Sequence, residues 1–184
     1  MPSIIVLTGK IGAGKSTAAH YLASRYGVKA LSFVELIWKP ILRERGVSPT
    51  RHNLQLLGLE LMRDRGPESL VGELMSIIDP VDESDCFCID DVRTESVYSA
   101  IKSEQPASVL VFIEASFDSR LPRVMRRDGI GGAEEQKSAE LVGTELGIAD
   151  LRASADLVIV NEGEPSRLHA SLDLLARSLM LTER

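Results

Sequence analysis

The chain has 184 residues, of which 44% are hydrophobic and 26% charged, so it holds enough apolar material for one globular domain with a buried core. Its formal net charge of -6 argues against broad binding to a nucleic-acid backbone. No apolar run approaches the roughly 18 residues of a membrane span, and no signal peptide is recognisable. We therefore expect a cytoplasmic protein without nucleic-acid or membrane partners.

Short apolar runs alternate along the chain with longer stretches of helical periodicity, which is the pattern of a parallel sheet covered by helices. The expected strands are brief apolar segments at residues 4–8, 30–33, 86–90, 108–113 and 157–160. The expected fold class is therefore α/β, with a five-stranded parallel sheet flanked by helices. We expect one domain over residues 1–184.

The first expected strand leads into a glycine-rich segment and then a helix. The segment reads Gly9-Lys10-Ile11-Gly12-Ala13-Gly14-Lys15-Ser16, which fits the pattern G-x-x-x-x-G-K-[ST]. Glycines at these positions let successive backbone N–H groups face one concave nest, and Lys15 reaches the β- and γ-phosphates of a nucleotide. Ser16 is expected to hold Mg²⁺ through its hydroxyl. The segment predicts binding of a nucleoside triphosphate.

A helical insertion at residues 34–79 separates the second and third expected strands. Helix breaks are expected at Pro40, at residues 46–49 and at residues 66–67. Ser48 is expected to be the N-cap of the next helix, with Pro49 as its first residue. These helices could form one wall of a cleft.

The insertion also carries candidate contacts to an acceptor substrate. Arg51, near a helix N-terminus, could bind an acceptor phosphate in a bidentate manner, and Arg63 lies further along the same helix. Glu35 follows the second strand and could orient an acceptor hydroxyl or sugar. Trp38 could stack on an acceptor base or fill the core, and core packing is the preferred interpretation.

The third expected strand ends in the residues Asp90-Asp91-Val92-Arg93. Ligands of an open α/β sheet gather beyond the carboxyl ends of its strands, so Asp90 or Asp91 is expected near Mg²⁺ and Arg93 near an acceptor phosphate. Asp90 is the preferred acid on the metal side because it continues the strand directly. The alternative is a polar turn with an aspartate as helix cap.

A helix at residues 118–127 follows the fourth expected strand and carries Arg120, Arg123 and Arg127 on one face. Clustered arginines repel one another unless an anion relieves the repulsion, so we expect a lid over the triphosphate within residues 118–147. A solvated helix face is the alternative. The glycines of residues 128–132 suit a hinge, and further helices are expected at residues 134–146 and after the fifth strand.

In the order of these segments the chain resembles the nucleoside monophosphate kinases of the P-loop superfamily. It is most similar to phage-type deoxynucleoside monophosphate kinases and to dephospho-CoA kinases, and it also looks similar to an uncharacterised archaeal family of kinase-like P-loop proteins. The matching segments are residues 9–17, 50–58 with Arg63 after them, 89–93, the arginine helix and 155–161. The resemblance implies a P-loop NTPase fold with a helical acceptor-binding insertion and an arginine-bearing lid. It also implies ATP and Mg²⁺ as cosubstrates.

The resemblance further implies roles for single residues. Arg51 and Arg93 would bind the acceptor, Arg123 or Arg127 would act from the lid, and residues 161–163, with Asn161 and Gly163 at their ends, would lie beside the adenine. The nucleotide phosphates and the metal would be bound by Gly9, Ile11, Gly12, Ala13, Gly14, Lys15, Ser16 and Thr17.

The leading hypothesis is transfer of the γ-phosphoryl group of ATP to a nucleoside or deoxynucleoside monophosphate, with Lys15, Asp90, Arg123 and Arg127 as catalytic residues. One alternative is a dephospho-CoA kinase, whose acceptor is a ribose hydroxyl and for which a carboxylate base at Glu35 or Asp90 would matter more. The other is a nucleotide-dependent regulatory module without acceptor-dependent activity.

Overall fold

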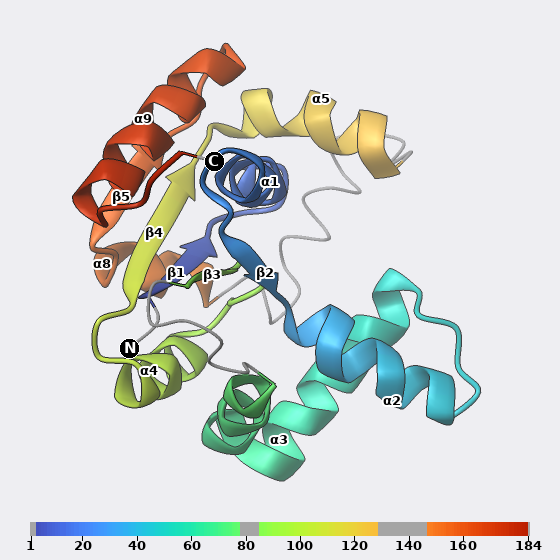
Figure 1. The fold of residues 1–184 in the computed structure, drawn as a ribbon. Helices are drawn as coiled ribbons and strands as arrows, with labels where there is room; N and C mark the ends of the chain where they lie inside the picture. Colours follow the sequence, from blue (N-terminus) through green and yellow to red (C-terminus); the bar gives the residue numbers. More distant parts are fainter. Residues whose placement is uncertain (1–2, 78–84, 129–146, 184) are drawn as a thin grey trace.

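The computed structural model describes residues 3–77, 85–128 and 147–183. At its centre lies a five-stranded parallel sheet with the strand order β2-β3-β1-β4-β5 (Figure 1). The strands confirm the predicted α/β class, with ends shifted by one or two residues in four of the five predicted segments. They are β1 (Ser3–Thr8), β2 (Lys29–Leu31), β3 (Cys86–Ile89), β4 (Val109–Glu114) and β5 (Leu157–Val160).

The central strand β1 pairs with β3 on one side and with β4 on the other. The strand order therefore reverses at β1, and an open α/β sheet binds its ligands at such a point, beyond the carboxyl ends of the strands. Val6 of β1 is paired with Ile89, the last residue of β3. The residues that follow these two strands consequently emerge side by side at one edge of the sheet.

Each face of the sheet has its own hydrophobic core, because successive side chains of a strand point to opposite faces. Ile5 and Leu7 of β1 belong to one core, which is covered by α1 (Lys15–Tyr26) and α9 (Pro165–Ser178). Ile4 and Val6 belong to the other, which is covered by α3 (Arg51–Ser76), α4 (Glu95–Glu104) and α8 (Ile148–Ala153) (Figure 1). The candidate site lies between these two helical layers, at the carboxyl ends of the strands.

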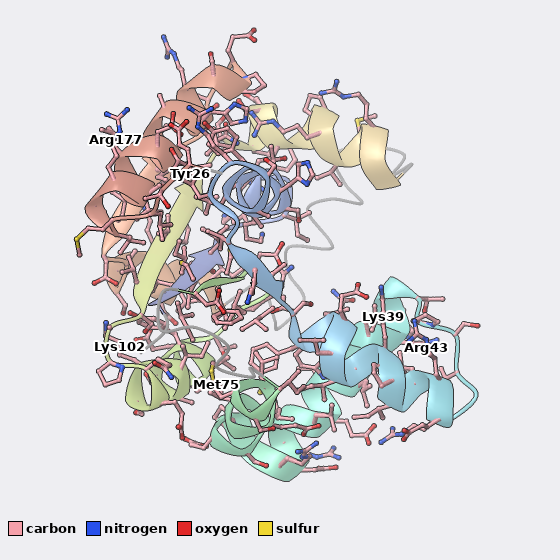
Figure 2. All side chains as sticks on the ribbon, in the orientation of Figure 1. Tyr26, Lys39, Arg43, Met75, Lys102 and Arg177 are labelled. Carbon is pink, nitrogen blue, oxygen red and sulfur yellow. The ribbon has the colours of Figure 1, made fainter. Side chains whose placement is uncertain are left out.

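The helical insertion begins with a π-helical turn, η1 (Val34–Trp38), that continues into α2 (Lys39–Glu44). Lys39 and Arg43 of α2 lie on this part of the molecule, away from the sheet (Figure 2). The break predicted at Pro40 is wrong, because Trp38 and Lys39 keep helical dihedral angles. Pro40 directly follows the π-helical turn, in which the N–H of Lys39 donates to the carbonyl oxygen of Val34, and this wider turn accommodates the proline ring inside a continuous helix.

The long helix α3 begins later than predicted. Its N-cap is Thr50, whose Oγ1 accepts a hydrogen bond from the backbone N–H of Asn53 at 3.2 Å, and not Ser48. Pro49 therefore lies in the preceding loop. The predicted break at residues 66–67 is confirmed as a kink, since Gly66 has a φ of 76° and a ψ of 160° and Pro67 follows it.

The helix predicted at residues 118–127 is confirmed as α5 (Phe117–Asp128), which lies beside α1 (Figure 1). The predicted final helix is confirmed as α9, which buries Leu168, Leu172 and Leu175. The helix predicted at residues 134–146 and nearly all of the predicted hinge lie outside the described residues. Among the residues that are described, no helix is both long and apolar enough to cross a membrane.

Candidate active site

The glycine-rich loop between β1 and α1 has a backbone that requires glycine. Gly9, Gly12 and Gly14 have φ angles of 138°, 79° and 108°. A Cβ atom on Gly9 would lie 2.2 Å from the carbonyl oxygen of Ile113, and one on Gly14 would lie 2.4 Å from Nδ2 of Asn161. Side chains at these positions would meet both a strained backbone and occupied space, so the glycines keep the loop close to β4 and to the loop after β5.

The loop closes around the side chain of Lys15, the first residue of α1. Lys15 is only 9% exposed, and its Nζ donates to the carbonyl oxygens of Gly9 at 2.6 Å and Lys10 at 3.2 Å. Thr17 is exposed in the first turn of the same helix. A cation, a concave backbone and a helix N-terminus therefore coincide, which is an arrangement that suits phosphate groups.

Ser16 and Asp90 are brought together across 74 residues of sequence, because β1 and β3 are neighbours in the sheet. The hydroxyl of Ser16 donates to Oδ2 of Asp90 at 3.2 Å. A hydroxyl and a carboxylate oxygen are ligands that suit Mg²⁺, which usually completes its shell with water and substrate phosphates. These two residues could hold the ion.

The next carboxylate, Asp91, lies on the side of the helical insertion. Its Oδ2 accepts hydrogen bonds from Ser32 Oγ at 2.7 Å and from the N–H of Val34 at 3.1 Å, while its buried Oδ1 has no partner among the described residues. Burial, together with the nearby charge of Asp90, raises the pKa of Asp91 to about 6. The two hydrogen bonds and the charge of Arg93 act in the opposite direction and lower this pKa. Two adjacent aspartates thus lie in different environments.

A pocket of about 590 Å³ opens beside Asp91, between the helical insertion and the residues that follow β3. Its walls are mostly apolar, and its charged members are Lys39, Asp91 and Arg93. It is lined by Phe33, Val34, Trp38, Lys39, Pro49, Leu54, Gln55, Gly58, Leu59, Met62, Pro67, Asp91, Arg93, Thr94, Ser96 and Val97. The phosphate loop and this pocket are therefore joined by the consecutive residues Asp90 and Asp91.

The arginines of α5 hold the glycine-rich loop from the other side. Arg120 is 3% exposed and donates from NH1 to the carbonyl oxygen of Ile11 at 3.0 Å. Arg123 donates to the carbonyl oxygens of Gly12 at 3.4 Å and Asn161 at 3.1 Å. The expectation that Arg120 shares one ligand-facing or solvated surface with its neighbours is wrong, because tertiary packing buries its guanidinium against backbone carbonyls.

Asn161, directly after β5, ties a third segment to the loop. Its side chain is buried, and Nδ2 donates to the carbonyl oxygen of Ala13 at 2.7 Å. Gly163 completes the turn into α9 with a φ of 89°. The segment expected beside the adenine is therefore in direct contact with the glycine-rich loop.

Glu162 fixes the start of α5. Its carboxylate accepts hydrogen bonds from the N–H of Ser116, from the hydroxyl of Ser116 at 3.2 Å and from the hydroxyl of Ser119. These bonds, led by that of Ser119, lower the pKa of Glu162. The residues after β5 thus hold both the phosphate loop and the helix that carries the arginines.

Two candidates from the sequence are not brought to the pocket. The side chain of Glu35 is 59% exposed and pairs with Lys39, and that of Arg63 is 76% exposed and pairs with the aspartate next to it at 2.6 Å. Neither is among the pocket-lining residues. The side chains of Arg51 and Arg127 lie outside the described part of the structure.

Sequence reasoning missed several residues that shape the pocket. Ser32 orients Asp91, and Gln55 and Gly58 line the wall formed by α3. Gln55 and Gly58 both lie in the segment 50–58 that carries the resemblance, and a glycine inside an otherwise helical pattern was a further signal for Gly58. Trp38 is buried, as predicted, and it also lines the pocket.

The fold is that of the P-loop NTPases, and solved kinases share it. A gluconokinase from Sinorhizobium meliloti is 16% identical with a TM-score of 0.59, and the match covers 97% of this chain and 96% of that one. Shikimate kinase from Aquifex aeolicus is 15% identical with a TM-score of 0.52, covering 96% and 98%. The structure of TT1252 from Thermus thermophilus is 22% identical with a TM-score of 0.57, covering 97% and 98%. No known family and no curated protein matches the sequence.

Proposed function

We propose that this chain is an ATP-dependent small-molecule kinase that transfers the γ-phosphoryl group to a nucleoside or deoxynucleoside monophosphate. The observation that carries the proposal is the junction of two sites. Asp90 contacts Ser16 of the phosphate loop, and the next residue, Asp91, lines the neighbouring pocket. A donor phosphate and an acceptor held in these two places would meet at the end of β3. The structural similarity to solved kinases supports the proposal that the chain is an ATP-dependent small-molecule kinase.

On the donor side, phosphoryl transfer needs positioning and charge compensation more than covalent chemistry. The N–H groups of the loop and the Nζ of Lys15 would bind the β- and γ-phosphates, with Lys15 exchanging its contacts to loop carbonyls for contacts to phosphate oxygens. Ser16 and Asp90 would hold Mg²⁺, which supplies further charge neutralisation when bound. Arg123, which contacts the carbonyl oxygen of Gly12 in the loop, would compensate charge on the transferring group.

On the acceptor side, Arg93 and Lys39 are the cations that line the pocket, and a guanidinium is well suited to bidentate contact with a phosphate. The apolar walls suit the flat faces of a base. A phosphate acceptor is already ionised at neutral pH, so it needs no general base.

A second acceptor class, a hydroxyl as in dephospho-CoA kinases, is favoured by one observation. The buried Oδ1 of Asp91 has no partner among the described residues and lies in a residue that lines the pocket. A carboxylate placed there could accept the proton of an attacking hydroxyl, and general base catalysis contributes roughly 10²–10⁴-fold.

The test is a panel assay with purified protein, ATP and Mg²⁺, in which each ribo- and deoxynucleoside monophosphate and dephospho-CoA is tried separately and ADP and the phosphorylated product are measured. We expect one monophosphate to be turned over on the order of 1–100 s⁻¹. ADP formation at the acceptor-free background in every well would contradict the proposal.

The variant Asp91→Asn then separates the two acceptor classes. An amide oxygen can still accept from Ser32 and Val34, but it cannot take a proton, so transfer to a hydroxyl should fall by about 10²-fold or more and transfer to a phosphate by less than about tenfold. Asp85→Asn is the matched control. Asp85 precedes the same strand at its other end and pairs with Lys29 at 2.6 Å.

A further inference from the structure

The segment Asp90–Arg93, which joins the phosphate loop to the pocket, lies beyond the end of the strand pairing. The pairing of β1 with β3 ends at Val6 and Ile89, whereas β1 itself continues to Thr8, which is paired with Phe112 of β4. Residues 90–93, all within the described part of the chain, form neither helix nor strand. Contacts made by side chains therefore hold this segment in place.

Thr8, the last residue of β1, makes one of these contacts with the backbone of the segment. Its Oγ1 donates a hydrogen bond to the carbonyl oxygen of Val92 at 3.0 Å, across 84 residues of sequence. Both residues are almost completely buried. Loss of the hydroxyl would leave a buried carbonyl without this partner, so the bond contributes more to the position of the segment than a solvated one would.

The hydroxyl of Thr8 is not required by the packing of the core. Ile4 and Val6 of the same strand belong to the core on one face of the sheet, and the alternation of side chains places Thr8 on that face as well. A valine at this position would have nearly the same shape and would bury more apolar surface. What threonine adds is the directional bond to Val92.

This bond differs from the other contacts of the segment. Ser16 binds the side chain of Asp90, and under the proposed function both would turn to Mg²⁺ when the ion enters. Ser32 binds the side chain of Asp91. The hydroxyl of Thr8 binds the main chain instead, and neither a nucleotide nor the metal would displace it.

The two ends of the bond lie next to the two proposed substrates. Thr8 directly precedes Gly9, the first residue of the phosphate loop, whose carbonyl oxygen accepts from Lys15 at 2.6 Å. Val92 lies between Asp91 and Arg93, which both line the pocket. A shift of this segment relative to the loop would therefore change the distance between donor and acceptor without removing a contact to either.

We propose that Thr8 is a positioning residue, whose hydroxyl fixes the backbone of Asp90–Arg93 against the start of the phosphate loop and thereby sets the distance between donor and acceptor. Its effect on catalysis rests on the proposed function. A misplacement of about 1 Å can lower a rate on the order of 10²-fold. Because Ser16 and Ser32 still hold the segment, loss of the Thr8 bond alone should lower the rate by about tenfold.

Two variants of Thr8 separate its hydroxyl from its bulk. Thr8→Val keeps the shape and removes the hydroxyl, and with ATP and the best acceptor it should lower kcat by about tenfold while changing either KM by less than about threefold. Thr8→Ser keeps the hydroxyl and removes a buried methyl group. It should lower the urea midpoint but keep kcat within about threefold of the wild type.

Ile5→Val is the matched control for stability. Ile5 is fully buried on the same strand, but it belongs to the core on the opposite face of the sheet. Its truncation should lower the urea midpoint and leave kcat unchanged. A wild-type kcat in Thr8→Val, or an equal loss of kcat in Thr8→Val and Ile5→Val, would overturn the inference.

Amide hydrogen exchange of the free protein tests the same bond without any substrate. In peptides that cover residues 89–94, Thr8→Val should exchange about tenfold faster than the wild type, whereas Thr8→Ser and Ile5→Val should match the wild type. Unchanged exchange in Thr8→Val would overturn the inference whatever the acceptor proves to be. Faster exchange in Thr8→Val, in a protein whose wild type turns over no acceptor, would instead remove the proposed function and keep the anchoring of the segment by Thr8.

Discussion

The contact between Gly14 and Asn161 predicts a strongly non-additive pair of substitutions. Asn161→Ala removes the donor that lies 2.7 Å from the carbonyl oxygen of Ala13 and leaves that buried oxygen without this bond, which should cost about 2 kcal/mol. Gly14→Ala puts a Cβ 2.4 Å from Nδ2 of Asn161 at a φ of 108°. It adds about 2 kcal/mol of backbone strain and also expels the amide, so it should cost about 4 kcal/mol.

In the double variant the amide is already absent, so the new Cβ meets no clash and the hydrogen bond is lost only once. Its cost should therefore stay near 4 kcal/mol, about 2 kcal/mol less than additivity gives. Urea unfolding of the wild type, the two single variants and the double variant, without nucleotide and with an unchanged m-value, measures this coupling free energy between Gly14 and Asn161.

The pair Gly46→Ala and Asn161→Ala serves as the control. Gly46 has a similar positive φ of 67° but no atom within 4 Å of its would-be Cβ. These two changes should add within about 0.5 kcal/mol. If the Gly14 and Asn161 changes add equally well, then the described contact does not hold the loop after β5 against the phosphate loop.

Four further outcomes are expected. Lys15→Ala should lower kcat/KM by roughly 100-fold, and unchanged turnover would exclude phosphate binding by this lysine. Asp90→Asn should raise the Mg²⁺ concentration needed for half-maximal activity by about tenfold or more, whereas an unaltered Mg²⁺ titration would move the metal site elsewhere. Burial raises the pKa of Cys86 to about 11 and that of Cys88 well above its ordinary value. At pH 8, both thiols should therefore react far more slowly with a disulfide reagent in the native protein than in the urea-unfolded protein. Equal rates would contradict the burial of β3. The fold lowers the pKa of Glu162, so the stabilisation from its carboxylate is present above the ordinary glutamate pKa and is lost as the pH falls through the lower folded value. The difference in unfolding free energy between wild type and Glu162→Gln should therefore shrink in acid. A difference that stays constant with pH would refute the contribution of the Glu162 carboxylate at the start of α5.

The parts that sequence predicted well are those in which local pattern and sheet topology agree. The loop at residues 9–16 combines glycines at positive φ with a strand before it and a helix after it, and all of this is readable from neighbouring residues. Asp90 could be placed near Ser16 because residues at the carboxyl ends of adjacent parallel strands share one edge.

The parts that sequence predicted poorly depend on contacts between distant segments. The spacing of the arginines on α5 shows that they share a face, but the carbonyl that binds Arg120 lies 109 residues away in the chain. The charge of these side chains therefore predicted a ligand-facing or solvated surface, but packing buries Arg120, which donates a hydrogen bond to a backbone carbonyl of the glycine-rich loop. In the same way, Ser48 and Thr50 are both good helix caps, and the structure uses Thr50, whose Oγ1 accepts from the N–H of Asn53.

The kink of α3 divides this helix into two parts with different freedom to change in evolution. After Gly66, Leu70, Val71 and Leu74 are fully buried in the core, so substitutions there threaten the whole fold. Before it, Leu56 and Leu59 are 52% and 47% exposed, and the same turns form a wall of the pocket. Leu57 and Leu61 of the same part are buried, so a library that keeps these two and randomises the exposed positions Leu56 and Leu59 should yield folded proteins, and under the proposed function some of them should have an altered acceptor preference. The kink thus places most of the pocket-lining positions of α3 in the part before Gly66.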